Sequence, residues 1–257
     1  MDLSAFPPVA VVLDGLLTLV TTLGTVVEPV AGPSAAALGV VLLTLLVRLV
    51  LVPVGVSQVR AEIGRRRLAP AVAALNRRIT DPEARQRALT ALYASEKVSP
   101  LAGCLPTLAQ APVLTAVYSL FAHAEIAGHA NTLLTHTLFG TPLGANLFVV
   151  LTSGAAAVWP FVVLLAVLAV VVEVGRRLNL RFAGGSVAAP GASVGSPATG
   201  GPGQEAPAGL GAMLRWVPFV SVVFAAFAPL AAGIYLVTSA TWTLGERAVL
   251  RRVLTRA

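Results

Sequence analysis

Long apolar blocks alternate with short polar or basic segments along the whole chain. Four of these blocks approach or exceed the ~20 residues that a helix needs to cross a bilayer core. They cover residues 35–56, 100–121, 156–175 and 213–247. The last block is too long for one span and carries Pro229 near its middle, so we expect two helices there, 213–229 and 230–247. The pattern therefore predicts five transmembrane helices.

The composition agrees with a membrane protein. Of the 257 residues, 56% are apolar and only 11% are charged, whereas a soluble domain carries about 25% charged residues. A net charge of +7 could suit nucleic acid, but the basic residues stand between apolar blocks and do not interleave with aromatic residues. A single cysteine, Cys104, excludes an intramolecular disulfide.

The positions of lysine and arginine predict the orientation of the chain. Apart from Arg48, every basic residue falls in 57–99, 176–215 or 247–257. The segments 1–34 and 122–155 contain none. With five spans these two groups alternate across the membrane, and the positive-inside rule places the basic group in the cytoplasm. We expect the N-terminus outside, with 122–155 as an outer loop, and the C-terminus inside.

The first apolar stretch, Val9–Val27, lacks the basic region and the small-residue cleavage site of a signal peptide. Its polar residues follow one another at helical spacing and trace one face: Asp14, Thr18, Thr21, Thr25 and Glu28, with Thr22 beside them. This pattern favours an amphipathic helix in the outer interface, within the outer segment 1–34. A sixth span is the alternative.

The cytoplasmic segments differ in kind. Residues 57–99 read as two polar helices broken near Asp81 and Pro82, which suit a helix cap and a first turn, so a helical hairpin is expected. The segment 176–212 is a flexible loop, because 12 of residues 183–209 are glycine or proline. The segment 248–257 is a short basic tail.

Arg48 is the most informative residue, because an arginine within a membrane helix costs about 2.5–3.5 kcal/mol and usually faces a cavity or a partner. The alternative is snorkelling to the inner headgroups, about 12 Å away along the helix. Other polar residues share its depth band: Thr44, Gln110, Thr238, Ser239 and Thr241. No acidic residue lies in that band. If these side chains face one another, they line a wet, cationic cavity suited to an anionic group.

Nothing in the sequence indicates an enzyme or a cofactor. His123, His129 and His136 lie in one outer loop at spacings that match no metal motif. Cys104 has no base near it in the sequence and is expected to pack between helices. We find no nucleophile elbow, phosphate-binding loop or paired intramembrane carboxylates.

Three segments resemble the YidC-type membrane protein insertases, whose relatives work in mitochondria and chloroplasts. TLLVRLVLVPV, Thr44–Val54, looks like the first core helix of the family, with Arg48 followed five residues later by Pro53. Val98–Phe121 is similar to its most recognisable block, which has matching residues at Pro100, Gly103, Cys104, Pro106, Gln110, Pro112 and Tyr118. Ala228–Arg252 looks like its final helix and basic tail.

The chain departs from the family pattern in places. Leu236 stands where a tryptophan is usual, and Ala240 replaces a frequent asparagine. The likeness is to the compact form of Gram-positive bacteria, and the preference for arginine over lysine suggests an actinobacterium.

The resemblance implies an all-α membrane protein, with five transmembrane helices around a hydrophilic groove that opens to the cytoplasm and to lipid. Arg48 would attract acidic residues in the tail of a small single-span substrate, while Thr44, Gln110 and the Thr238–Thr241 group would hydrate the groove. Nascent membrane proteins would be the partners, along with lipids and the Sec translocon, the ribosome or the signal recognition particle. The protein would act as a monomer without metal or nucleotide. The competing hypothesis is an anion transporter or channel that uses Arg48, although transporters usually show inverted repeats and none is found in this sequence. A third hypothesis, a membrane enzyme, is not supported because the sequence offers no set of catalytic residues.

Overall fold

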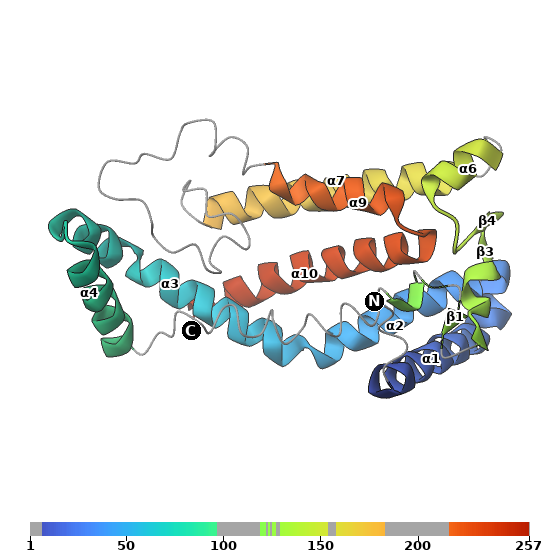
Figure 1. The fold of residues 1–257 in the computed structure, drawn as a ribbon, viewed down its shortest axis with the longest axis horizontal. Coiled ribbons are helices and arrows are strands. Elements are labelled where there is room, and N and C mark those ends of the chain that lie inside the picture. The colour runs from blue at the N-terminus through green and yellow to red at the C-terminus, as the bar shows by residue number, and fades with distance from the viewer. Residues whose placement is uncertain are drawn as a thin grey trace. The chain divides into compact units, whose positions relative to one another are not determined.

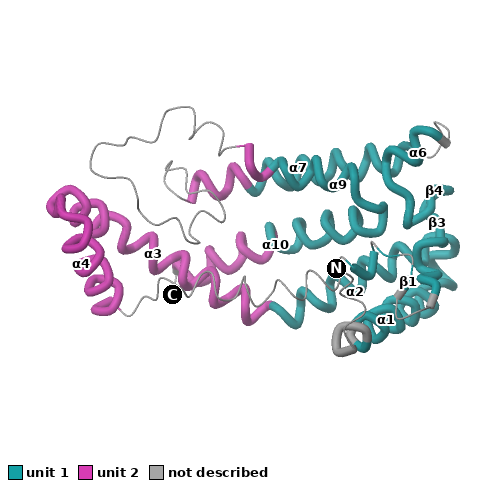
Figure 2. The backbone as a smooth tube through the Cα atoms, viewed as in Figure 1, with its two compact units in different colours: residues 1–51, 110–175, 219–244 teal, residues 52–109, 176–218, 245–257 magenta. Residues whose placement is uncertain are grey.

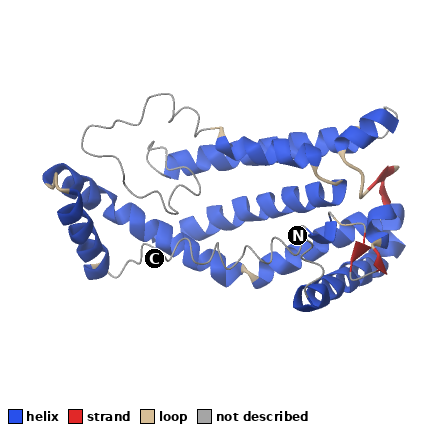
Figure 3. Ribbon diagram, in the orientation of Figure 1, coloured by secondary structure: helices blue, strands red, loops and turns tan. Residues whose placement is uncertain are grey.

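The computed structural model describes residues 7–96, 119–121, 123, 125–126, 129–153, 158–182 and 216–256. The described elements are mainly helices, with four two-residue strands paired into two small antiparallel hairpins (Figure 3). The chain divides into two compact units (Figure 2). Unit 1 holds residues 1–51, 110–175 and 219–244, and unit 2 holds 52–109, 176–218 and 245–257.

Unit 1 begins with two helices, α1 (Pro7–Ala31) and α2 (Ala35–Val50), which are joined by the short turn η2 (Gly32–Ser34) and pack side by side (Figure 1). Leu13 and Val20 of α1 are fully buried. Most of the polar positions that the sequence placed on one face are exposed: Asp14, Thr18, Thr22, Thr25 and Glu28. Helix α1 is therefore amphipathic, and its position relative to a membrane stays a prediction.

The two helices approach each other most closely at Gly39 of α2. A Cβ atom on Gly39 would lie 2.8 Å from the Val20 carbonyl oxygen and 3.2 Å from the Gly24 amide nitrogen. Ala35 and Ala36 contact the same region of α1. Small residues at such a crossing let two backbones meet, which is the usual way that membrane helices associate.

The predicted outer loop contains more structure than the sequence indicated. Strands β1 (Glu125–Ile126) and β2 (His129–Ala130) form one hairpin, and β3 (Thr137–Leu138) and β4 (Thr141–Pro142) form the other. The turn η3 (Thr132–Thr135) lies between the hairpins, and helix α6 (Leu147–Ser153) follows them. Leu133 and Leu143 are fully buried, so this segment contributes to the core of unit 1. The alternation of apolar and polar residues that marks a strand cannot be recognised in segments of two residues.

A two-residue turn, Phe139–Gly140, joins β3 and β4. Both residues have left-handed backbone conformations, with φ of 49° at Phe139 and 83° at Gly140. Glycine adopts this conformation freely, but a residue with a Cβ loses roughly 1–2 kcal/mol there. The turn therefore carries strain at Phe139.

The long final apolar block is divided into α9 (Val220–Phe227), preceded by the turn η5 (Val217–Phe219), and α10 (Leu230–Arg256). Ala228 is extended (φ −78°, ψ 155°), as expected of a residue that precedes proline. Two of the first N–H groups of α10 donate outside the helix, Leu230 to the Ala145 carbonyl and Ala231 to the Leu143 carbonyl, each at 2.9 Å. Carbonyl groups of Leu143 and Ala145 thus cap the start of α10.

Helix α7 (Trp159–Phe182) supplies another wall of the core of unit 1. Its side chains Phe161, Leu164 and Leu168 are buried. A Cβ atom on Gly233 of α10 would lie 3.0 Å from Leu164, so α7 and α10 are in close contact there. Helix α7 begins three residues after the predicted start at 156 and continues beyond 175.

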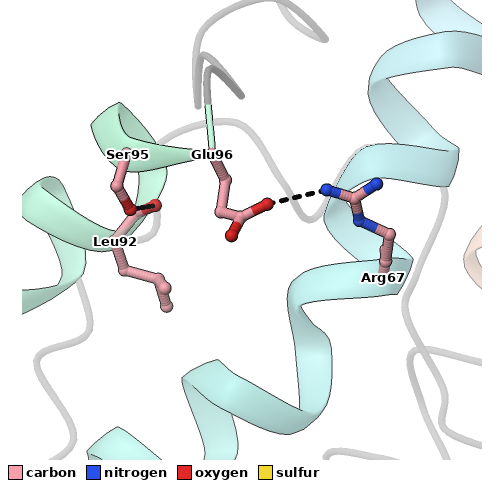
Figure 4. Close-up of polar contacts among 4 residues, drawn as sticks. All are labelled: Arg67, Leu92, Ser95 and Glu96. Atoms are coloured by element: carbon pink, nitrogen blue, oxygen red, sulfur yellow. Dashed lines mark hydrogen bonds and ion pairs between the residues drawn. The ribbon is translucent and has the colours of Figure 1, made fainter.

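In unit 2, α3 (Val52–Arg78) is followed by α4 (Pro82–Ser95). The Asp81 carboxylate accepts a hydrogen bond from the Ala84 N–H at 2.9 Å, which caps α4 as its sequence suggests. Arg67 of α3 pairs with Glu96 at 2.7 Å (Figure 4). Exposed pairs of this kind contribute about 0–1 kcal/mol. No apolar residue of α4 is fully buried, although Leu89, Leu92 and Tyr93 are partly buried.

Arg251 connects three helices of unit 2. Its Nη2 donates to Glu62 Oε1 of α3 at 2.6 Å and to Asn179 Oδ1 of α7 at 2.7 Å. Its guanidinium also lies over the Phe182 ring, 4.4 Å from the centroid. Arg251 belongs to α10 because this helix continues to Arg256, and residues 248–256 are therefore helical and not a separate basic tail.

Length and hydropathy single out one stretch of the described residues as able to cross a membrane, Leu13–Val50, 38 residues with a mean hydropathy of 2.2. A shorter apolar helix covers Val217–Phe227. Most of the predicted span 100–121 and all of 183–212 lie outside the described residues. The number of five spans therefore stays a prediction.

The α1–α2 crossing gives a direct test of the packing in unit 1. Gly39→Leu should lower the free energy of unfolding by about 1–3 kcal/mol, because the new side chain meets backbone atoms that cannot move aside. Gly15→Ala is the matched control, since nothing lies within 4 Å of a Cβ atom there. Thermal unfolding in detergent micelles would measure both variants. Equal melting temperatures would show that the helices do not cross at Gly39.

Candidate functional site: the Arg48–Ser239 contact

Arg48 lies near the end of α2, in unit 1, and is partly buried. Its Nε donates a hydrogen bond to the Ser239 hydroxyl oxygen at 3.0 Å, and its Nη2 donates to the same oxygen. Ser239 belongs to α10 and is almost completely buried, so a residue far along the sequence holds the guanidinium in place. The contact is directed into the protein and does not have the form of a side chain that reaches outward to headgroups.

The charge of Arg48 is not neutralised by this contact. Ser239 is a neutral acceptor, and within the described residues no carboxylate pairs with Arg48. Two of the N–H-bearing nitrogens of the guanidinium, Nε and Nη2, contact Ser239, and an arginine carries further donors. The site therefore keeps a positive charge and donors that could meet an anionic group.

Arg251 in unit 2 provides a contrast. This arginine is also buried, and it has a carboxylate, an amide oxygen and an aromatic face as partners. A buried charge without an opposite charge is usually costly. The chain thus neutralises the arginine that connects helices in unit 2, whereas the hydrogen-bond partner of Arg48 among the described residues is the neutral hydroxyl of Ser239.

Tyr235 belongs to the same site, although the sequence analysis did not identify it. It lies one helical turn before Ser239 and is buried, with its hydroxyl in electrostatic contact with Arg48 and hydrogen-bonded to Ser239. Its ring contacts Phe121, with the centroids 6.2 Å apart. The i, i+4 spacing of Tyr235 and Ser239 was the available signal, since such residues share one face of a helix.

The hydroxyls of the predicted groove residues Thr44, Thr238 and Thr241 bond within their own helices. Thr44 is 1% exposed and its hydroxyl donates to the Val40 carbonyl at 2.7 Å. Thr238 donates to the Ile234 carbonyl and Thr241 to the Val237 carbonyl, each at 2.8 Å. Thr241 is exposed. Thr238 and Thr241, i and i+3, share one face of α10, whereas Ser239 faces another side, and among these three Ser239 is the residue that bonds to Arg48.

Gln110 lies outside the described residues, as do the motif positions Pro100, Gly103, Cys104, Pro106, Pro112 and Tyr118. Pro53 is the second residue of α3, immediately after the chain leaves α2 at Leu51. The first turn of a helix is where proline is tolerated, because the missing N–H would have no partner there. Pro53 thus marks the boundary between the helix that carries Arg48 and the polar helix α3.

Within the described residues, no group of three His, Cys, Asp or Glu side chains is positioned to hold a metal ion. The His123 ring nitrogen Nδ1 lies 3.0 Å from the Ser119 carbonyl oxygen. His136 is exposed.

Comparison with known proteins gives a family and several relatives. The profile of the family described as 60Kd inner membrane protein matches residues 27–257. A membrane protein insertase YidC of Clostridium perfringens is 41% identical over 81 residues, which cover 31% of this chain and 34% of that protein. The proteins of the same name from Burkholderia lata and Burkholderia mallei are 37% identical over 101 residues, 38% of this chain and 18% of theirs.

The chain thus spans about a third of the Clostridium relative and about a fifth of the Burkholderia relatives in the regions that it matches. None of these relatives comes from an actinobacterium, so the actinobacterial origin inferred from the arginine content stays a prediction.

The Arg48–Ser239 contact can be tested by its stability. Ser239→Ala should lower the free energy of unfolding by about 1–3 kcal/mol, because it leaves the guanidinium without its acceptor. Thr241→Ala is the matched control, since Thr241 is exposed and its hydroxyl bonds only to its own helix. Chemical denaturation of both variants, in wild-type and Arg48→Gln backgrounds, gives the coupling. An equal cost of Ser239→Ala in both backgrounds would contradict the contact.

Proposed function

Because the chain belongs to the 60Kd inner membrane protein family, the family of the YidC-type insertases, we propose that it inserts small membrane proteins into the bacterial cytoplasmic membrane. Membership confirms the family that the sequence motifs predict. The observation that carries the proposal is Arg48, a partly buried arginine that a neutral hydroxyl holds in place.

In the proposed arrangement, five transmembrane helices surround a hydrophilic groove that opens to the cytoplasm. The N-terminus is outside and the C-terminus is in the cytoplasm, which follows from the distribution of basic residues. Helix α1 lies in the outer interface with its Asp14–Glu28 face toward water. Arg48 and Ser239 lie in the groove, and Gln110 contributes from the second span.

Arg48 acts as the capture point for a substrate. Acidic residues in the N-terminal tail of a single-span protein approach from the cytoplasm and bind the unneutralised guanidinium. Charge-assisted hydrogen bonds of this kind contribute about 1.5–3 kcal/mol. The bond compensates part of the cost of moving a polar tail into the membrane, and the tail is then released to the outer side.

The apolar helix of the substrate leaves the groove sideways into lipid, because transfer of apolar surface out of water is favourable and a helix satisfies its own backbone hydrogen bonds. This step requires no nucleotide and no metal. The driving force lies in the substrate, and the protein lowers the barrier by supplying water and one positive charge partway across the membrane.

Helices α3 and α4 are the proposed contact with incoming chains and with the Sec translocon, the ribosome or the signal recognition particle. No apolar residue of α4 is fully buried, so much of its surface is available to a partner. The functional unit in this proposal is one copy of the chain, in contact with membrane lipid.

The test is insertion into liposomes that contain the purified protein. A small single-span protein with an acidic tail is translated beside them, and protease protection of the tail is measured. Arg48→Ala should reduce insertion by about tenfold or more, the value of one charge-assisted hydrogen bond. Ser239→Asp should also reduce it, because a resident carboxylate would compete with the substrate for Arg48. Ser239→Asn, which adds no charge, should retain most of the activity.

Arg252→Ala is the control for a general loss of positive charge, since Arg252 is exposed on the last turns of α10. Insertion that is equal in the wild type and Arg48→Ala would contradict charge capture. Absence of insertion together with uptake of chloride or phosphate into sealed vesicles would contradict the insertase function and favour an anion transporter.

A further inference from the structure

Arg85 lies in the first turn of α4, in unit 2, and is only 8% exposed. It shares one face of α4 with Leu89 and Leu92, at the i, i+4 and i+7 positions that a helix usually buries against a neighbour. Leu89 and Leu92 are partly buried, together with Ala88 and Tyr93, and every other residue of α4 is exposed. An arginine therefore occupies a position where the pattern of α4 calls for an apolar side chain.

The side chain of Arg85 has no polar partner within the described residues. Its backbone N–H donates to the Asp81 carbonyl at 3.0 Å, but its guanidinium makes no hydrogen bond, ion pair or ring contact among these residues. A guanidinium carries five N–H donors, and a charge that is withdrawn from water without a partner is costly. The contacts of the described residues thus explain the position of Arg85 but not its charge.

The carboxylates of this part of the chain are already engaged. Residues 52–96 contain eight arginines but only four acidic residues. Each acidic side chain has a partner: Glu62 pairs with Arg251, Asp81 caps α4, Glu83 pairs with Arg87 and Glu96 pairs with Arg67. Helices α3 and α4 therefore carry excess positive charge, and among those eight arginines only Arg85 is buried.

The surroundings of Arg85 favour a carboxylate on a protein over a phosphate of a nucleic acid. Phosphate chains are bound by several arginines or lysines that stand together on an exposed surface. Arg85 instead lies on the leucine side of α4, and arginine and tyrosine side chains in desolvated surroundings are typical of the centre of a protein interface. An amphipathic helix with a carboxylate beside leucines would match both its charge and its apolar neighbours.

We propose that Arg85 binds a carboxylate of a partner protein, presented on an amphipathic helix that packs along α4 from the turn between α3 and α4. The proposal rests on the proposed role of these two helices as a contact surface, and it adds the chemistry that this surface recognises. The guanidinium gains its missing acceptor only in the complex, so the contact selects a partner that carries the carboxylate.

Amide hydrogen exchange of α4 in the full-length protein separates this role from a structural one. Arg85→Leu should protect the α4 amides as well as the wild type or better, because leucine suits the apolar face and removes a charge without a partner. Arg87→Leu is the matched control, since Arg87 is exposed on the same helix and pairs with Glu83. A loss of protection in Arg85→Leu alone would overturn the proposal, because the arginine would then serve the fold.

The binding test uses full-length protein in detergent and two arrays of short synthetic amphipathic peptides. Each peptide of the first array carries one glutamate among leucines and glutamines, and the second array has glutamine in place of that glutamate. The wild type and Arg87→Leu should bind the glutamate peptides about tenfold or more tightly than their glutamine counterparts, as expected of one charge-assisted hydrogen bond. Arg85→Leu should bind the two arrays equally.

The absence of a preference for glutamate in the wild type, or the same preference in Arg85→Leu, would overturn the proposal. Binding of single-stranded RNA that depends on Arg85 would also overturn it, because a nucleic acid would then be the partner. Insertion into liposomes tests the insertase function separately, since no partner protein is present there. Arg85→Leu should insert the single-span protein as well as the wild type, and a loss of insertion would place Arg85 in the insertion step instead.

Discussion

The structure of unit 1 depends on how a membrane protein accommodates the positive charge of Arg48. A guanidinium among apolar helices needs hydrogen-bond acceptors, but a carboxylate partner would remove its ability to attract an anion. The chain meets both requirements with Ser239, which accepts from Nε and Nη2 and contributes no charge. Arg251 shows the other solution within the same chain, since its Nη2 bonds to the Glu62 carboxylate, which neutralises the charge, and to Asn179.

The position of Ser239 in turn depends on packing elsewhere in unit 1. The start of α10 is held by the segment before α6, where the Leu143 and Ala145 carbonyls accept from the first N–H groups of α10. Gly233 lets α10 approach α7 closely. Gly39 lets α2, the helix that carries Arg48, pack closely against α1. Small residues and a capped helix start therefore determine where Arg48 and Ser239 lie, although none of these residues touches the charge.

Features set by local chemistry could be predicted from the sequence. Pro229 forces an extended residue before it, so the break between α9 and α10 lies at Ala228. Asp81 caps α4 because its side chain reaches the N–H of Ala84 three residues on. The polar face of α1 follows from helical periodicity. Arg48 stood out because its chemical type conflicts with the apolar residues around it.

Features that depend on residues distant in sequence could not be predicted. Depth along the helix grouped Thr238, Ser239 and Thr241, but Ser239 faces a different side of α10 from the other two, and the packing of α10 selects Ser239. Thr44 lies one turn before Arg48, yet its hydroxyl donates to the Val40 carbonyl of its own helix. The hairpins between Glu125 and Pro142 are too short to leave a pattern. Tyr235 could be assigned to the site only from its contacts with Arg48 and Ser239 in the structure.

The central claim is that the sign of the charge at position 48 selects the substrate tail. Reversing the charge at position 48 tests this. Arg48→Glu and wild-type protein are each reconstituted in liposomes without a membrane potential. Insertion of one single-span protein is then measured with an acidic tail and with a lysine tail. The account predicts that wild type prefers the acidic tail and that Arg48→Glu prefers the lysine tail. The same order of tail preference in both proteins would contradict it.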